Sequence, residues 1–416
     1  MYPGLLAEDS LYTIGEIRSG TVTVWFTAWW AFLVKGLTLN THAISLATLA
    51  GVLTFTWAVR AWAAAVLPAG PARAWAVLAI SATPLVGAMG IQLRHDTWMT
   101  SGLLLWTALI VRTNGMRAPL TLADLATLFA VVLLLPTRHN GMPTVAVAGT
   151  IGLWLFHAGR ARHAMTLAVV VVSTVAITQA ATRAAGQPHA VDPAQTVEWA
   201  MADVSCLLTQ GVEPTAAEWD VLERMAARVD WPQVGACRFV NPIQFSPSFR
   251  FASVEGQVGP MLQTWWSVLK RHPWLMLETH LKRVSLFLPP FLAGMPHADS
   301  ARSIHSSIFT NGLGIAWRFP RVAGIAQLSI RAWHRGRLLL ANAAVWLIAL
   351  VAIWWVTPDP RRGLAYTIVI ATVLLAALVA TAPVSEARYG LYVLVCGQLT
   401  FVYWLLGLAN RPPRLN

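Results

Sequence analysis

Charged residues are scarce in this chain. Only 12% of its 416 residues are Asp, Glu, Lys or Arg, whereas a typical soluble domain carries roughly 25%. Acidic residues are the rarer kind. The chain has 18 Asp and Glu and 30 Lys and Arg, which gives a formal net charge of +12. Hydrophobic residues make up 56% of the chain, and the mean hydropathy is +0.57. These values exclude a soluble globular domain and indicate a polytopic α-helical integral membrane protein.

Cysteine is nearly absent as well. Cys206, Cys237 and Cys396 form no CxxC pair and no other metal-ligand spacing, so we expect them to be structural. The sequence also lacks a nucleophile elbow, a P-loop, an HExxH pair and a dinucleotide-binding fingerprint. The basic residues form no single patch for nucleic acid. They stand in ones and twos between apolar runs, as the positive-inside rule expects of a membrane protein.

Tryptophan and long apolar runs are what the chain does contain. The 21 Trp residues suit a membrane protein, because indole rings favour the headgroup interface. A transmembrane helix needs about 20 mostly apolar residues. Candidate spans lie at residues 42–67, 73–92, 97–111, 120–135, 142–156, 165–181, 338–356, 364–382 and 391–408. Segment 21–37 is also apolar and either spans or lies in the interface as a Trp-anchored helix.

The loop charges predict a topology. If loops 68–73, 112–117 and 159–163 are cytoplasmic, then the corners at 94–96 and 138–140 face the other side, and so does the long segment 182–337. Segment 21–37 then does not span.

The predicted fold is an all-α polytopic membrane protein of roughly nine to ten transmembrane helices with a large extracytoplasmic, mostly helical loop domain. Its expected parts are an acidic loop (1–20), a transmembrane module (21–181), the loop domain (182–337) and C-terminal spans (338–416).

The long segment has a different composition. Residues 182–337 contain 11 of the 18 acidic residues. Asp192-Pro193 predicts a helix start, Gly211 its end, and Thr215 with Glu218 a capping box. Apolar but charged helices around 261–291 fit an interfacial position better than a span. On this placement Cys206 and Cys237 face an oxidising compartment, where they either form a disulfide or stay apart, since the sequence does not show whether they are within bridging range.

Candidate chemistry gathers at the predicted membrane boundaries. Glu8 and Asp9 precede the first membrane-associated segment, and carboxylates there either bind a divalent cation, accept a proton, or belong to a frayed, solvated N-terminus. His95 and Asp96 stand at a corner between two spans. Ionisable residues at membrane depth are functional candidates by default, whereas the alternative is a solvated, snorkelling turn.

Two further clusters combine an arginine with a hydrogen-bonding neighbour. Arg138 and His139 stand at a span end on the same predicted side as Asp96, and Arg388 with Tyr389 stands at the start of the last span. Guanidinium groups bind phosphate with two hydrogen bonds. The alternatives are an Asn-Gly turn at the first cluster and an interfacial anchor at the second. Taken together, acids and arginines at one membrane face predict an enzyme that handles a lipid-linked phosphate.

The chain resembles the bacterial polytopic glycosyltransferases of the GT-C superfamily, especially a poorly characterised branch of sugar transferases. Soft motifs carry this resemblance, in order, along nearly the whole chain. They are Tyr2-Pro3-Gly4 with Asp9-Ser10, Pro84, His95-Asp96, Arg138-His139-Asn140, the stretch from Glu198 to Ser205, Trp265-Trp266, His272-Pro273-Trp274-Leu275, Arg283 and Glu386-Ala387-Arg388-Tyr389.

The resemblance implies a multi-pass enzyme of the bacterial inner (plasma) membrane. It would move a sugar from a polyprenyl-phosphate donor to a glycan, lipid or protein acceptor on the extracytoplasmic face, with inversion. Asp9 would be the general base, and Asp96 the second acidic position, orienting the acceptor or helping to hold a divalent cation if one is used. The substrate and the donor phosphate would be bound by six residues, namely Glu8, His95, Arg138, His139, Arg388 and Tyr389. Its partners would be this donor, the acceptor and the bilayer, and no nucleic acid.

The chain also departs from the pattern. GT-C proteins carry a spanning helix before the acidic loop, so we expect either a misplaced start or a protein without that helix. His95 replaces the usual Lys, and no His-Pro-Pro type motif follows the acidic loop. The alternative function is a transporter or flippase of lipid-linked sugar, or a non-catalytic membrane scaffold. A transporter would be expected to show inverted repeats and broken spans, and no convincing repeat is evident, which favours an enzyme.

Overall fold

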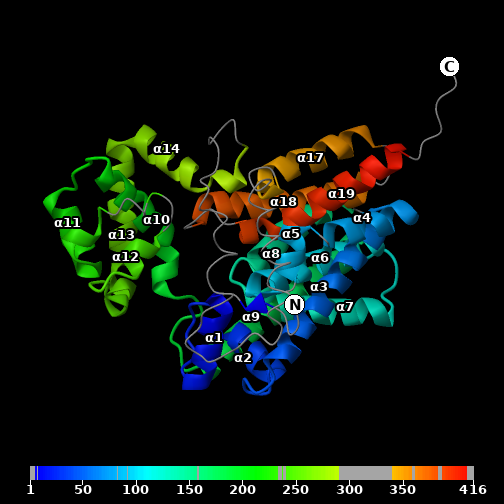
Figure 1. The fold of residues 1–416 in the computed structure, drawn as a ribbon, viewed down its shortest axis with the longest axis horizontal. Coiled ribbons are helices and arrows are strands. Elements are labelled where there is room, and N and C mark those ends of the chain that lie inside the picture. Colours follow the sequence, from blue (N-terminus) through cyan, green and yellow to red (C-terminus); the bar gives the residue numbers. More distant parts are fainter. Residues whose placement is uncertain are drawn as a thin grey trace, which may run out of the picture. The chain divides into compact units, whose positions relative to one another are not determined.

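The computed structural model describes residues 5–6, 8–81, 83–90, 92–156, 159–232, 237, 240–289, 340–357, 361–382 and 387–409. The chain divides into two compact units, shown in Figure 1. Unit 1 comprises Met1–Ala190, Ala301–Ala376 and Ala387–Asn416, and unit 2 comprises Val191–Ser300 and Ala377–Glu386. Nearly all described elements of both units are helices. This all-α architecture confirms the helical class expected from the composition.

Unit 1 is a bundle of mostly apolar helices. In chain order they are α1 (Glu8–Ser19), α2 (Ala28–Leu37), α3 (Ile44–Val66), α4 (Pro71–Ser81), α5 (Pro84–Gly90), α6 (His95–Arg112), α7 (Leu122–Leu134), η1 (Leu135–Thr137), α8 (Gly141–Leu155), α9 (Arg160–Ala184), α17 (Ala343–Val356), the first part of α18 (Arg361–Thr381), η7 (Ala387–Gly390) and α19 (Leu391–Ala409). Helix α6 is buried along nearly its whole length and packs against α3 and α7. It is therefore the core helix of this unit.

Four helices are long and apolar enough to cross a membrane. They are Ile44–Val66, Arg160–Ala184, Arg362–Thr381 and Arg388–Gly407. Shorter apolar helices occupy Ala28–Leu37, Leu122–Thr137, Gly141–Leu155 and Ala343–Val356. The described residues thus support a membrane protein with several apolar helices.

One of the expected spans needs correction, and segment 21–37 is too short to span, as the predicted topology expects. Segment 73–92 is not one helix, because α4 ends at Ser81 and α5 begins at Pro84, and proline favours the first position of a helix. Segment 21–37 forms only the 10-residue helix α2, which at 1.5 Å per residue is about 15 Å long and too short to span. Its Trp30 is buried and donates a hydrogen bond from Nε1 to the Thr13 hydroxyl (3.2 Å), so α2 packs against α1.

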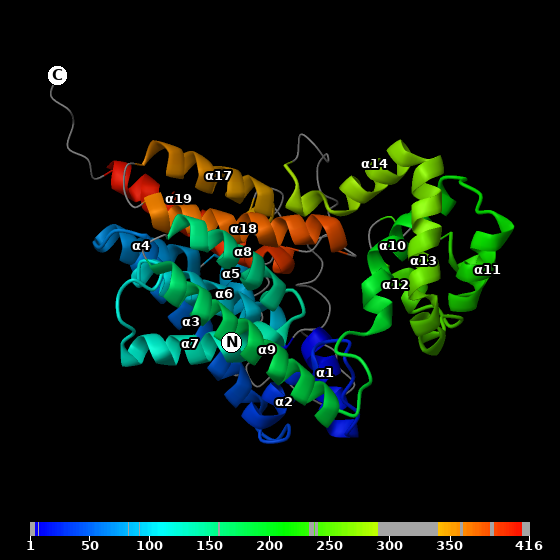
Figure 2. The ribbon, with the colours of Figure 1, turned by 180° about the vertical axis from the view of Figure 1, so that it is seen from behind.

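Unit 2 contains α10 (Pro193–Thr209), α11 (Ala216–Met225), η3 (Arg228–Asp230), α12 (Asn241–Gln244), α13 (Phe251–Arg271), α14 (Pro273–Arg283) and η5 (Ser285–Phe287). Helix α13 packs against α10 and α11, as both views show (Figure 1 and Figure 2). The Asp192 carboxylate caps α10 through the Ala194 amide (2.8 Å), and Thr215 and Glu218 form the expected capping box of α11. These helix starts confirm the sequence prediction.

Cys206 and Cys237 form a disulfide in unit 2, with their Cα atoms 4.5 Å apart. The sequence left their pairing open. The bond ties α10 to the chain that follows η3, and it leaves Cys396, buried in α19, as the free cysteine.

A buried charged network holds the helices of unit 2 together. The Asp203 carboxylate on α10 accepts hydrogen bonds from Arg283 on α14 (2.6 Å) and from the Trp265 indole on α13 (3.0 Å). The His280 Nδ1 atom lies 3.0 Å from the same carboxylate. Burial raises the pKa of Asp203, but the guanidinium of Arg283 and the hydrogen bond from His280 outweigh it and hold the pKa below its usual range. Asp203 therefore stays ionised and is the central contact of three helices.

We expect Asp203→Asn to destabilise unit 2, because it leaves the buried guanidinium of Arg283 without a counter-charge. Breaking one partner of a buried pair costs roughly 3–5 kcal/mol. Thermal unfolding in detergent should show a lower melting temperature. The matched control is Asp220→Asn, which removes an exposed i,i+4 pair with Arg224 and should change stability by about 0–1 kcal/mol. Equal effects of the two substitutions would contradict the assigned role.

Candidate active site

A short backbone pairing brings the N-terminus to the start of α6. Strand β1 (Leu5–Leu6) pairs in parallel with β2 (Gln92–Leu93), in the register Leu5 with Gln92 and Leu6 with Leu93. In the first turn of α1, the Ser10 hydroxyl donates a hydrogen bond to the carbonyl of Leu93. These contacts place α1 beside the residues that begin α6, although the two segments are far apart in sequence.

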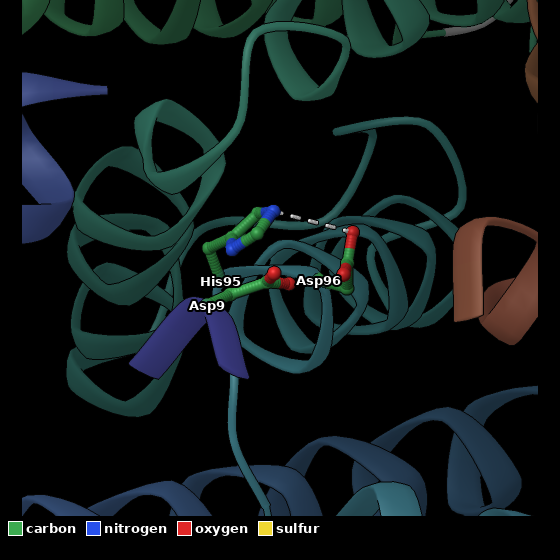
Figure 3. A group of neighbouring side chains, drawn as sticks. All are labelled: Asp9, His95 and Asp96. Atoms are coloured by element: carbon green, nitrogen blue, oxygen red, sulfur yellow. Dashed lines mark ion pairs between the residues drawn. The ribbon is translucent and has the colours of Figure 1, made fainter. Parts of the chain in front are cut away.

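Three ligand-type side chains meet there. Asp9 on α1 and His95 and Asp96 on α6 each offer an atom within 4.8 Å of the others. Figure 3 shows the Asp9 carboxylate pointing towards Asp96, with the His95 ring above them. His95 Nε2 lies 3.7 Å from Asp96 Oδ1 (Figure 3), and the ring packs against Phe26, at 4.7 Å between centroids. Asp96 is almost fully buried.

Arg138 reaches Asp96 and His95 from the turn between η1 and α8. It forms an ion pair with Asp96 and lies 3.2 Å from His95 Nε2. The Thr137 hydroxyl next to it donates to the His95 carbonyl (3.3 Å), which fixes this turn against the start of α6. A Cβ at Gly141 would lie 2.5 Å from the carbonyl oxygen of Leu135, so the tight turn needs glycine at that position. The Asn-Gly pair is thus turn chemistry that also positions Arg138.

Arg388 reaches the cluster from η7, ahead of the last helix. It forms an ion pair with Asp9, and its Nε lies 3.7 Å from Asp96. Both guanidinium groups pack against the ring of Tyr389, with the Cζ of Arg138 at 4.1 Å and that of Arg388 at 5.0 Å from its centroid. Arg388 also donates to the Tyr389 hydroxyl (3.4 Å). The ring therefore holds both cations beside the two carboxylates.

The electrostatics of the site favour an anion. Burial raises the pKa of Asp9, but the guanidinium groups of Arg388, Arg94 and Arg138 outweigh burial and hold the pKa well below its usual range. Asp9 is therefore ionised. Among the described side chains of this cluster, the three arginines exceed the carboxylates of Asp9 and Asp96 by one positive charge. An anion such as a phosphate would compensate that charge.

The structure brings together six of the residues expected from the sequence, namely Asp9, His95, Asp96, Arg138, Arg388 and Tyr389. His139 hydrogen-bonds the backbone of Val24 with its imidazole, and burial together with the neighbouring Arg138 guanidinium lowers its pKa to about 4. Glu8 begins α1, and its side chain lies outside the described residues.

Two alternatives from the sequence are wrong. The N-terminus is not frayed at Asp9, because this residue lies in α1 and pairs with Arg388. The His95-Asp96 corner is not a solvated turn, because both side chains are buried. The sequence places Arg94 in the same corner motif as His95 and Asp96 but assigns it no role in the site, although it acts on the charge of Asp9. Its position directly before His95 and Asp96 is the sequence feature that indicates a place in the site.

Comparison of the chain with protein-family models, with curated proteins and with solved structures found no match.

A divalent cation fits this arrangement poorly. Asp9, His95 and Asp96 are chemically suitable ligands. However, Asp9 is paired with Arg388 and Asp96 with Arg138, and a cation would have to displace both guanidinium groups while remaining close to them. We assign no metal to this site.

We therefore expect millimolar Mg²⁺ or Mn²⁺ to leave the melting temperature of the purified protein unchanged, and EDTA to have no effect. A cation present at 100 times its dissociation constant would add about 2.7 kcal/mol to stability, which thermal unfolding detects easily. A saturable rise in melting temperature that disappears in Asp96→Asn would contradict this expectation.

Proposed function

We propose that the protein is a membrane glycosyltransferase that moves a sugar from a polyprenyl-phosphate donor to an acceptor hydroxyl on the extracytoplasmic face. The observation that carries the proposal is the meeting of Asp9 and Asp96 with Arg138 and Arg388 at the ends of apolar helices. Carboxylates and guanidinium groups at one place provide a proton acceptor and a phosphate site together. The soft motifs shared with GT-C glycosyltransferases agree with this combination.

The proposal includes a polytopic inner-membrane protein with the helical segment 182–337 outside the cytoplasm. The Cys206–Cys237 disulfide supports this placement, because disulfides persist in oxidising compartments such as the bacterial periplasm. The four long apolar helices support insertion in the bilayer. Asp9 and the start of α6 would then lie at the extracytoplasmic boundary.

In the proposed reaction, the acceptor oxygen attacks the anomeric carbon of the donor sugar. Asp9 takes the proton of the attacking hydroxyl, and a new C–O bond forms as the bond between the anomeric carbon and the phosphate oxygen breaks. The electron pair of the broken bond stays on the polyprenyl phosphate, which Arg138 and Arg388 stabilise as it leaves. Attack from the face opposite the phosphate inverts the anomeric carbon. Asp96 holds Arg138 in place and orients the acceptor.

We expect Asp9→Asn to reduce sugar transfer by roughly 10²–10⁴-fold, because an amide cannot accept the proton and general-base catalysis contributes about that factor. Transfer is measured with a radiolabelled polyprenyl-phosphate sugar in membranes or detergent. Because Asp9 pairs with Arg388, the substitution should also lower the melting temperature, so rates must be compared below the onset of unfolding. The control Glu16→Gln, on the same helix, should retain transfer.

Full transfer by folded Asp9→Asn would exclude Asp9 as the base. The flippase alternative replaces the enzyme if the wild type moves lipid-linked sugar across vesicle membranes without transferring it, and if Asp9→Asn moves this lipid as fast as the wild type does.

A second expectation concerns the arginines. A guanidinium that binds two phosphate oxygens cannot be replaced by lysine, whereas one that only supplies positive charge can. We expect Arg138→Lys and Arg388→Lys each to lose roughly ten- to a hundred-fold in kcat/KM for the donor, since a charge-assisted hydrogen bond contributes about 1.5–3 kcal/mol, and the Ala variants to lose more. Arg112→Lys is the control, because Arg112 pairs with Asp124 outside this cluster. Wild-type kinetics in both Lys variants would leave the arginines as helix anchors.

A further inference from the structure

The two arginines of the proposed phosphate site already hold anions that belong to the protein. Arg388 pairs with Asp9 and approaches Asp96 at 3.7 Å, and Arg138 pairs with Asp96. The side chains of Arg138 and Arg388 are only 17% and 12% exposed. Little of either guanidinium is thus left for water.

A carboxylate and a phosphate bind a guanidinium in the same way. Each presents two oxygens to parallel N–H groups of the planar fork. The Nη1 group of Arg388 holds Asp9 and its Nε lies beside Asp96, so this guanidinium cannot fully bind a phosphate at the same time. A phosphate that binds here must exchange with a carboxylate rather than add to it.

We propose that Asp9 and Asp96 occupy the phosphate-binding faces of Arg388 and Arg138 in the resting protein, so that donor phosphate competes with the carboxylates and releases Asp9 to act as the base. This inference rests on the proposed function and adds an order of events. The donor binds first, and only then is Asp9 free to take a proton from the acceptor.

The charges around the site agree with this exchange. A phosphodiester carries one negative charge, which matches the net positive charge left by three arginines and two carboxylates. Once Arg388 binds phosphate, Asp9 stays largely buried but loses its nearest cation, and a desolvated carboxylate without a cation is a stronger proton acceptor. The resting pair thus keeps the base inactive until the leaving group is in place.

The experiment measures phosphate binding rather than transfer. Farnesyl phosphate and inorganic phosphate are titrated into the purified full-length protein in detergent by calorimetry. We expect Asp9→Asn to bind farnesyl phosphate about tenfold more tightly than wild type, which corresponds to about 1.4 kcal/mol of lost competition. Asp96→Asn should change affinity in the same direction, and it decides the question if Asp9→Asn does not fold. Arg388→Gln should lose binding.

The matched control is Asp220→Asn, which breaks an aspartate–arginine pair in unit 2 and should leave the dissociation constant unchanged. Tighter binding of both ligands identifies free phosphate as a sufficient ligand, whereas tighter binding of farnesyl phosphate alone identifies the lipid-linked form. Unchanged or weaker binding in the folded aspartate variants overturns the exchange.

The outcome separates this inference from the proposed function. Tighter binding without any sugar transfer by wild type would keep the exchange and reject the transferase. Transfer by wild type without tighter binding in the variants would keep the transferase and reject the ordered exchange.

Discussion

Buried charge has to be compensated, and in unit 1 this requirement joins four segments of the chain. Asp9 comes from α1, Asp96 from the start of α6, Arg138 from the turn before α8, and Arg388 from η7 ahead of α19. Arg138 pairs with Asp96, and Arg388 pairs with Asp9 and lies near Asp96, so each of these largely buried charges has a counter-charge from another segment. The helix ends are therefore positioned by electrostatics as well as by apolar packing, and the proposed chemistry depends on this positioning.

Apolar packing supplies the frame in which the charges meet. Helix α6 is buried from His95 to Ile110 and contacts α3 and α7, so its first turn has little freedom to move. The pairing of Leu5–Leu6 with Gln92–Leu93 then fixes α1 against this turn. The Tyr389 ring, with both arginines packed on it, holds two like charges near each other. The charged groups are therefore held close together before any anion binds.

Unit 2 uses the same principle for stability. Asp203 is fully buried and is bound by Arg283, Trp265 and His280, which come from two other helices. These contacts join α10 to α13 and α14 through one buried carboxylate. In unit 2 one carboxylate, Asp203, joins three helices. In unit 1 two carboxylates, Asp9 and Asp96, pair with Arg388 and Arg138, the two arginines of the proposed phosphate site.

The sequence by itself determined the helical class, the apolar runs, the caps at Asp192 and Thr215, and the clusters from which site residues come. These follow from local rules of hydropathy and capping that act over a few residues. It did not determine the break between α4 and α5, the length of α2, the Cys206–Cys237 pair or the hydrogen bond of His139 to the backbone of Val24. Only the tertiary structure decided that Asp9 pairs with Arg388, because residues so far apart meet through helix packing and strand pairing that no local pattern encodes.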